Sequence, residues 1–370
     1  MFNKFTKMEN FVELKENYNH IESPYDLIYL CYIKSAHNKS LHVDRNLCLI
    51  NHVLGIFSGY IFPFIGTFGL VGNATIFYIF IFKYSKITRQ TVFLTFLAVS
   101  DFTNIFSFGW LWIFPAKGLP YMSRGKIYFF ISNISDVACK SFRSFITFSS
   151  TWAIGAFLMI CIDRMLAILF PMQLIKYGYK SAITSSVIMV FLCLLFASPV
   201  LVHSKFVKID FKMLCNPFGD DNLNIIKFIK IWYLLFVYGG AVPVLLILLF
   251  NTLLLWKVKD YRKKLKKLAE SSNSMSRKEL KATILVLILT VFFLIGSIIK
   301  ILVDVLYINF QNISRLEINS IEKYNIEDFY NIWDISSIIT LFMESMNVLI
   351  YYAKIKRFRI ECNKILCINL

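Results

Sequence analysis

Hydrophobic residues of this 370-residue chain are gathered into seven long runs, and polar and charged residues are concentrated between them. The runs lie at 53–82, 91–114, 138–162, 182–202, 228–256, 282–308 and 332–353. A helix rises ~1.5 Å per residue and a bilayer core is ~30 Å thick, so about 20 apolar residues cross a membrane. The pattern therefore predicts an all-α membrane protein, a seven-transmembrane helix bundle in residues 53–353.

The segments outside the runs differ in charge. Residues 1–52 carry six Lys or Arg and six Asp or Glu. On one face of a seven-pass bundle, 21 Lys or Arg stand against five Asp or Glu, in segments 83–90, 163–180, 257–281 and 353–370. Because basic loops stay cytoplasmic, we expect residues 1–52 to be an extracellular tail, with the N-terminus outside. Residues 354–370 are expected to be a cytoplasmic tail with a short amphipathic helix.

The composition supports a membrane protein. Hydrophobic residues make up 57% of the chain and charged residues only 17%, whereas soluble domains carry about 25% charged residues. The net charge of +17 would suit nucleic acid, but it is interleaved with seven apolar spans, so the lipid bilayer is the expected partner. No HExxH or GxSxG motif and no phosphate-binding glycine loop occurs, which argues against an enzyme.

Glycosylation sequons and cysteines agree with this topology. The sequons at Asn38, Asn133 and Asn312 all fall on the predicted outer face. Four cysteines also lie there, where disulfides persist: Cys31, Cys48, Cys139 and Cys215.

One apolar segment carries chemistry at both of its ends. It begins at Cys139 and ends at the tripeptide Asp163-Arg164-Met165, with Arg164 following the cysteine by 25 positions. The segment resembles the third helix of rhodopsin-like G-protein-coupled receptors, where the same spacing separates a cysteine from the arginine of an Asp/Glu-Arg-Tyr motif. The resemblance implies a multi-pass receptor of the plasma membrane that activates a heterotrimeric G protein.

Further matches follow in the family's order. They are Gly72-Asn73, Leu97 to Asp101, Pro199, Pro243 and the stretch Asn347 to Tyr351. Several positions depart from the family: Met165 replaces tyrosine, Val348 replaces proline, and residues 291–299 hold neither tryptophan nor proline. This pattern resembles divergent invertebrate members, similar to FMRFamide-like peptide receptors or nematode chemosensory receptors.

The resemblance places a polar core around Asp101. In the family this aspartate meets asparagines of the first and seventh helices, here Asn73 and Asn347, and often holds a sodium ion. Glu344 adds a second carboxylate one helical turn before Asn347, and two close carboxylates need a cation or proton between them. Alternatively, Glu344 faces a polar cavity or binds a backbone carbonyl. Apart from this sodium, no cofactor is expected.

At the cytoplasmic end, Asp163 and Arg164 are the expected switch for coupling to the G protein. An ion pair between the neighbours would hold the arginine in the resting state and release it on activation. Met165, Asn347 and Tyr351 belong to the same expected switch region. The alternative is an anchor pair that only sets the orientation of the helix.

At the outer end, the alternation of residues 207–213 predicts a strand and a hairpin. The resemblance implies that Cys215 joins Cys139, as in the peptide-binding members, while Cys31 and Cys48 form a second candidate pair. Ile146 stands where amine receptors have aspartate, which disfavours an amine ligand. Near it, Lys140 and Arg143 would contact an anionic group of the ligand or extend to the lipid interface.

These features favour an extracellular neuropeptide ligand. A chemosensory receptor for small odorants is the first alternative. A secondary transporter with Asp101 and Glu344 as ion-coupling residues is the second, although no paired broken helices are visible.

Overall fold

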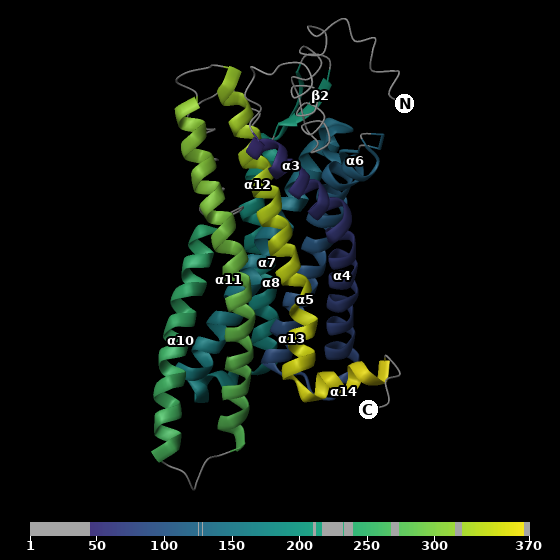
Figure 1. Ribbon diagram of the computed structural model, residues 1–370. Coiled ribbons are helices and arrows are strands. Elements are labelled where there is room, and N and C mark those ends of the chain that lie inside the picture. The colour runs from purple at the N-terminus through teal and green to yellow at the C-terminus, as the bar shows by residue number, and fades with distance from the viewer. Residues whose placement is uncertain are drawn as a thin grey trace, which may run out of the picture.

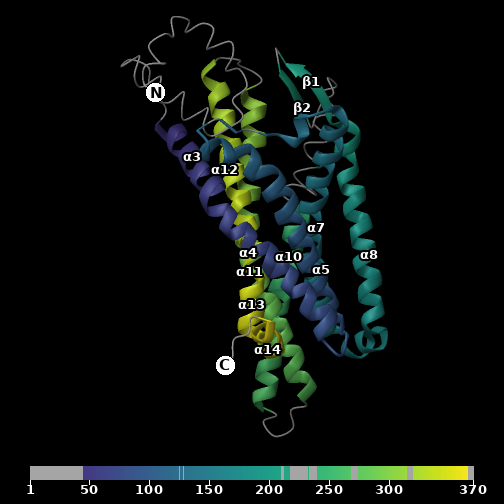
Figure 2. The ribbon, with the colours of Figure 1, turned by 90° about the vertical axis from the view of Figure 1, so that its right-hand side faces the viewer.

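The computed structural model describes residues 45–124, 126, 127, 129–209, 212–216, 232, 240–267, 274–314 and 320–365. Its helices lie side by side in an elongated bundle (Figures 1 and 2). A two-stranded sheet lies at one end of the bundle, and the last helix, α14, lies crosswise at the other (Figure 1).

The first two spans are long helices with π-helical segments. The first consists of α3 (Arg45–Ile56), η2 (Phe57–Ile61), α4 (Phe62–Tyr78) and η3 (Ile79–Lys83). The second consists of α5 (Arg89–Asn104), η4 (Ile105–Gly118) and α6 (Leu119–Met122). Thr88 fixes the start of α5 through a reciprocal pair of hydrogen bonds. The Thr88 hydroxyl accepts from the Thr91 backbone nitrogen, and the Thr91 hydroxyl accepts from the Thr88 backbone nitrogen.

The third and fourth spans are single long helices. A short 3₁₀ turn, η5 (Ile131–Asn133), precedes α7 (Asp136–Leu169), whose N-terminus is capped by Ser135. Helix α8 (Pro171–His203) follows directly and is kinked at Gly178, where φ is +59°. This left-handed backbone favours glycine because the residue has no Cβ.

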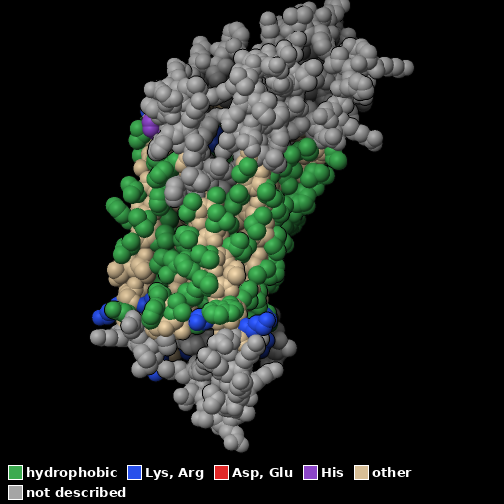
Figure 3. Space-filling view, turned by 90° about the vertical axis from the view of Figure 1, so that its left-hand side faces the viewer, with side chains coloured by type: hydrophobic (Ala, Val, Ile, Leu, Met, Phe, Trp, Pro, Cys, Tyr) green, Lys and Arg blue, Asp and Glu red, His purple; other side chains and the backbone are tan. Residues whose placement is uncertain are grey.

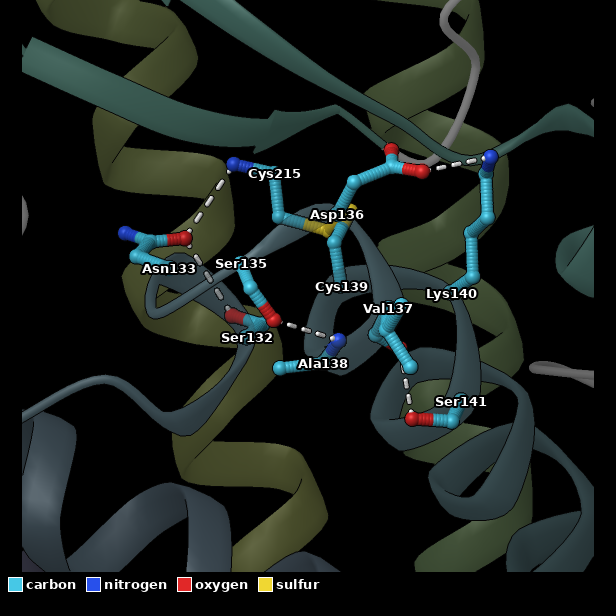
Figure 4. The surroundings of a disulfide bond; sticks show 10 residues. All are labelled: Ser132, Asn133, Ser135, Asp136, Val137, Ala138, Cys139, Lys140, Ser141 and Cys215. Carbon is cyan, nitrogen blue, oxygen red and sulfur yellow. Dashed lines mark hydrogen bonds and ion pairs between the residues drawn. A yellow bond between two sulfur atoms is a disulfide. The ribbon is translucent and has the colours of Figure 1, made fainter.

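After α8 the chain forms the predicted hairpin. Strand β1 (Lys205–Ile209) pairs with antiparallel β2 (Lys212–Asn216), and Phe206 stands opposite Cys215. The pairing places Cys215 directly over the start of α7 (Figure 4).

Three long helices and one short helix complete the bundle. They are α10 (Ala241–Lys267), α11 (Ser274–Ser314), α12 (Ser320–Ser345) and α13 (Asn347–Lys354). Within the described residues, six helical spans are long and apolar enough to cross a membrane, and the shorter apolar helix 241–257 belongs to the fifth predicted run. That run begins at 228 and lies partly outside the described residues.

The last span ends in the predicted amphipathic helix, α14 (Lys356–Ile365). Phe358 and Cys362, one turn apart, are buried on one side of α14, and charged residues occupy other positions.

An apolar belt surrounds the bundle. In Figure 3 the described surface between the two ends is mostly hydrophobic, with Lys and Arg along its lower border. Exposed Leu, Ile, Val and Phe side chains on most spans form this belt, as expected where the surrounding solvent is lipid. We call the end with β1 and β2 the hairpin end, and the end with α14 the basic end.

Candidate functional site

The Asp163–Arg164 pair lies on the last third of α7, near the basic end. Both residues are buried, with exposed fractions of 2% and 4%. Arg164 Nε donates to Asp163 Oδ2 at 3.2 Å, and its Nη2 contacts the same oxygen. The arginine is therefore folded back onto its neighbour, as expected for the resting state.

A second arginine, which the sequence analysis did not single out, binds the same aspartate. Arg89 at the start of α5 donates to Asp163 Oδ1 from Nε at 3.0 Å and from Nη2 at 2.7 Å. Its Nη1 donates to the Gly178 carbonyl at 3.1 Å and contacts the Ser181 hydroxyl. Arg89 thus joins α5, α7 and α8, and each Asp163 oxygen has its own arginine. The only sequence signal is a basic residue directly after the Thr88 cap.

The other expected switch residues pack in the basic-end core. Met165 is buried in one apolar cluster with Leu254 of α10 and Leu287 of α11. Tyr351 is fully buried, with its ring centroid 6.0 Å from that of Phe80 and 6.1 Å from that of Phe358. These contacts join the seventh span to the first span and to α14.

The seventh span is interrupted even though Val348 replaces the family's proline. Helix α12 ends at Ser345 and α13 begins at Asn347, with Met346 in a turn between them. The Ser345 hydroxyl donates to the Leu341 carbonyl at 2.8 Å, a bond that bends helices. At the break, Asn347 Nδ2 donates to Asp101 Oδ2 at 2.6 Å.

The polar core around Asp101 forms with one of its two expected hydrogen-bond partners. Asn73 is buried, yet neither its amide oxygen nor its nitrogen has a hydrogen-bond partner. Asp101 Oδ1 likewise has none. Asn73 therefore lies in the interior as expected but does not hydrogen-bond to Asp101. The one described hydrogen bond of the carboxylate comes from the seventh span, because the break before Asn347 presents that amide to it.

Glu344 is bound by a side chain that the sequence analysis missed. Asn104 Nδ2 donates to both carboxylate oxygens, at 2.9 and 3.0 Å. The Asn104 oxygen in turn accepts from Ser150 at 3.1 Å and from Ser149 at 3.4 Å. The partner of Glu344 is thus a side-chain amide, whereas one of the alternatives was a backbone carbonyl. The network of hydrogen bonds joins the second, third and seventh spans.

At the hairpin end, the predicted Cys139–Cys215 disulfide is present. The two Cα atoms are 5.3 Å apart, within the usual ~4.4–6.8 Å. Figure 4 shows that Asn133 also reaches the hairpin, since its Oδ1 accepts from the Cys215 backbone nitrogen at 3.1 Å. Cys48 is disulfide-bonded as well, whereas its predicted partner Cys31 lies outside the described residues.

The three predicted glycosylation sites have different surroundings. The Asn133 side chain accepts a hydrogen bond from the Cys215 backbone, and Ser135 of the same sequon caps α7. Asn38 lies outside the described residues. Asn312 falls in the last turn of α11. Glycosylation itself stays a prediction.

The three candidate ligand-contacting residues separate in the structure. Lys140 is exposed and pairs with Asp136 on its own helix, with Nζ–Oδ2 2.7 Å. Ile146 is buried in the hairpin-end apolar core with Phe108 and Phe142, and its contact with a ligand stays a prediction. Arg143 faces the second span, and its Cζ lies 4.1 Å from the Trp112 ring centroid.

Comparison with known proteins settles the family. No curated protein matches the chain. The family model described as "7 transmembrane receptor (rhodopsin family)" matches residues 72–351, well over half of the chain. That range includes the described switch pair, the polar core and the disulfide. The chain belongs to the rhodopsin family of seven-transmembrane receptors.

Proposed function

We propose that this plasma-membrane receptor, which signals through G proteins, takes a peptide ligand at its hairpin end, and that this end is extracellular. The β1–β2 hairpin carries the proposal. The Cys139–Cys215 disulfide and the Asn133 bond fix it over α7. A strand pair fixed in this way offers backbone groups to an extended peptide. The excess of basic residues at the opposite end supports the orientation.

At the basic end, Arg164 is the proposed contact for the G protein. In the described state its guanidinium is held by Asp163. A ligand that binds better to a state in which this pair is broken shifts the receptor toward that state. The freed guanidinium then offers a planar fork of donors to a carbonyl or carboxylate of the partner.

A sodium ion at Asp101 is a second element of the proposal. Asp101 Oδ1 and the Asn73 oxygen are buried acceptors without a hydrogen-bond partner in the described structure, and such oxygens suit a small cation. Asp101 and Asn73 would hold the ion. Its charge would offset the repulsion between Asp101 and Glu344.

The sodium element is tested by ligand affinity. Asp101→Asn removes the formal charge and nearly preserves the shape. In the wild type, replacing sodium by a large organic cation should change ligand affinity, whereas the variant should show no such change. Sodium dependence that persists unchanged in Asp101→Asn would reject the ion and leave Asp101 as a hydrogen-bonding residue.

The ligand class is tested by a screen. Cells that express the full chain are exposed to a peptide library and to a set of small odorants, with calcium and cAMP as readouts. A peptide response that is lost with Cys139→Ser at matched surface expression would support the proposal. A response to odorants alone would favour the chemosensory alternative. Transport of an ion or solute without a G-protein response would favour the transporter.

A further inference from the structure

One carboxylate and three cations lie together in the hairpin-end half of the bundle. Asp334 of α12 forms an ion pair with Lys117 of η4, with 3.4 Å between Nζ and Oδ2. Arg143 of α7 and Lys300 of α11 also interact electrostatically with this carboxylate. Four different spans therefore direct charge toward one place.

These groups are shielded from solvent and surrounded by aromatic rings. Asp334 is 5% exposed and Lys300 is 9% exposed. Lys300 Nζ lies 4.9 Å from the Trp333 ring centroid and 5.7 Å from that of Phe108. Because aromatic faces attract cations, they hold the ammonium group in place without neutralising it.

The described side chains of the cluster are mostly cationic. The four described side chains have three positive charges and one negative charge. Ionisable groups within the membrane are costly and are, by default, candidates for function. The cations have other interactions as well. An incoming anion would therefore have to displace some of their present partners.

Resting on the peptide-receptor function proposed above, we propose that Lys117, Arg143, Lys300 and Asp334 form an anion site that binds a carboxylate of the ligand. The carboxylate belongs to an acidic side chain or to a free C-terminus of a peptide. Lys117, Arg143 and Lys300 donate charge-assisted hydrogen bonds to it. When the ligand is absent, Asp334 is the anion that interacts with these cations. The neighbouring tryptophans favour an aromatic group beside the carboxylate of the ligand.

Lys300 links this anion site to the polar core. The lysine also interacts electrostatically with Glu344, which Asn104 holds two residues before the break at Met346. Lys300 lies on α11, just after residues 291–299, which contain neither tryptophan nor proline. An anion that draws Lys300 away from Glu344 would thus change the electrostatics of the polar core. This arrangement gives α11 a means of responding to the ligand.

The test compares probes that differ only in charge. The purified full-length receptor is titrated with 3-indolepropionate and with 3-indolepropionamide at constant ionic strength, and thermal unfolding reports binding. A second pair is the peptide Gly-Gly-Phe with a free C-terminus and with a C-terminal amide. The acid of at least one pair should bind about tenfold more tightly than its amide, because only the acid forms charge-assisted hydrogen bonds. The pair that shows the preference identifies a peptide or a small organic acid as the source.

Variants assign the preference to the anion site. Lys300→Gln and Arg143→Gln should each lower the acid affinity to near that of the amide, and Lys300→Arg should retain it. Lys364→Gln is the matched control, because this exposed lysine of α14 lies at the basic end and pairs with Glu361. If Lys300→Gln unfolds and binds neither probe, Arg143→Gln decides.

Equal binding of acid and amide in both pairs, or an acid preference that survives both variants, would overturn the anion site. Because the assay measures binding without a G protein, that outcome would leave the proposed coupling through Arg164 intact. Failure of the coupling would conversely leave the acid preference intact.

Discussion

Two buried aspartates at opposite ends of the bundle are each surrounded by cations, but in different ways. Asp163 at the basic end has both oxygens bound by arginines, with Arg89 as close as 2.7 Å. Asp334 at the hairpin end is 3.4 Å from Lys117, longer than the ~2.7–2.9 Å of a charge-assisted hydrogen bond. Its other two cations act on it electrostatically.

The difference separates a closed contact from an exchangeable one. Arginine presents a rigid planar fork of donors. Here each arginine places two nitrogens on one Asp163 oxygen, so four nitrogens hold the carboxylate. Asp163 is therefore held until a large free-energy change releases it. Two of the three cations around Asp334 are lysines. Because lysine is a point charge on a flexible stem, these two can turn toward another anion at lower cost. The ion pairs at the basic end therefore suit a restraint on Arg164, and the cluster at the hairpin end suits ligand recognition.

The largest expected effect concerns Arg164. Arg164→Ala should lower agonist-stimulated signalling at least about tenfold, because it removes a contact made only in the active state. Ligand binding should be nearly unchanged, since the residue lies ~38 Å along α7 from Cys139 at the hairpin end. If the variant signalled at the wild-type level with matched surface expression, Arg164 would not be the contact for the G protein.

Asp163 and Arg89 should act in opposite directions. Asp163→Asn should raise basal signalling about three- to tenfold, because the charge that restrains Arg164 is gone. Arg89→Gln should lower basal signalling, because Asp163 would then be left without a described partner when Arg164 departs.

The double variant checks this argument. In the Asp163→Asn background, Arg89→Gln should have almost no further effect on basal signalling. A rise in basal signalling with Arg89→Gln alone would instead mean that Arg89 only positions the aspartate.

A smaller effect is expected at Asp334. Asp334→Asn should increase the affinity for 3-indolepropionate about threefold, since it removes the anion that competes for the three cations. The affinity for the amide should stay constant, which can be measured in the same thermal titration. A drop in acid affinity would mean that Asp334 positions the cations more than it competes for them.

The smallest effect is expected at Gly178, whose carbonyl accepts from Arg89. Gly178→Ala should destabilise the receptor by about 1–3 kcal/mol, because the backbone at φ +59° and ψ −166° is open essentially to glycine alone. An added Cβ would meet nothing within 4 Å, so crowding does not contribute. Gly178→Asn is the matched control and should cost about as much, since asparagine tolerates a positive φ only with ψ near about +50°, whereas ψ at Gly178 is −166°. Equal unfolding temperatures for Gly178→Ala and the wild type would contradict the argument.

Much of the fold was predictable because its signals are local. Long apolar runs determined the spans, and the alternation before Cys215 predicted the hairpin. The spacing from Cys139 to Arg164 identified the family. The break at Met346 was less accessible, since it forms without a proline and depends on Ser345 and Asn347.

The partners of the charged residues were not predictable in the same way. Arg89 and Asp163 are 74 positions apart, and Asn104 and Glu344 are 240 apart. Such pairs depend on how far each helix is rotated about its axis and how deeply it lies in the bundle. No local pattern encodes either quantity, so Asn73 was placed on Asp101 and Asn104 was missed.

The sequence by itself thus determined a seven-helix receptor, its hairpin and the positions of its switch residues, because hydrophobic period and motif spacing are properties of adjacent residues. Only the tertiary structure decided that Arg89 shares Asp163, and that Lys117, Arg143 and Lys300 converge on Asp334. Packing of the helices against one another sets these contacts, because it decides which side chains of different spans come close enough to pair.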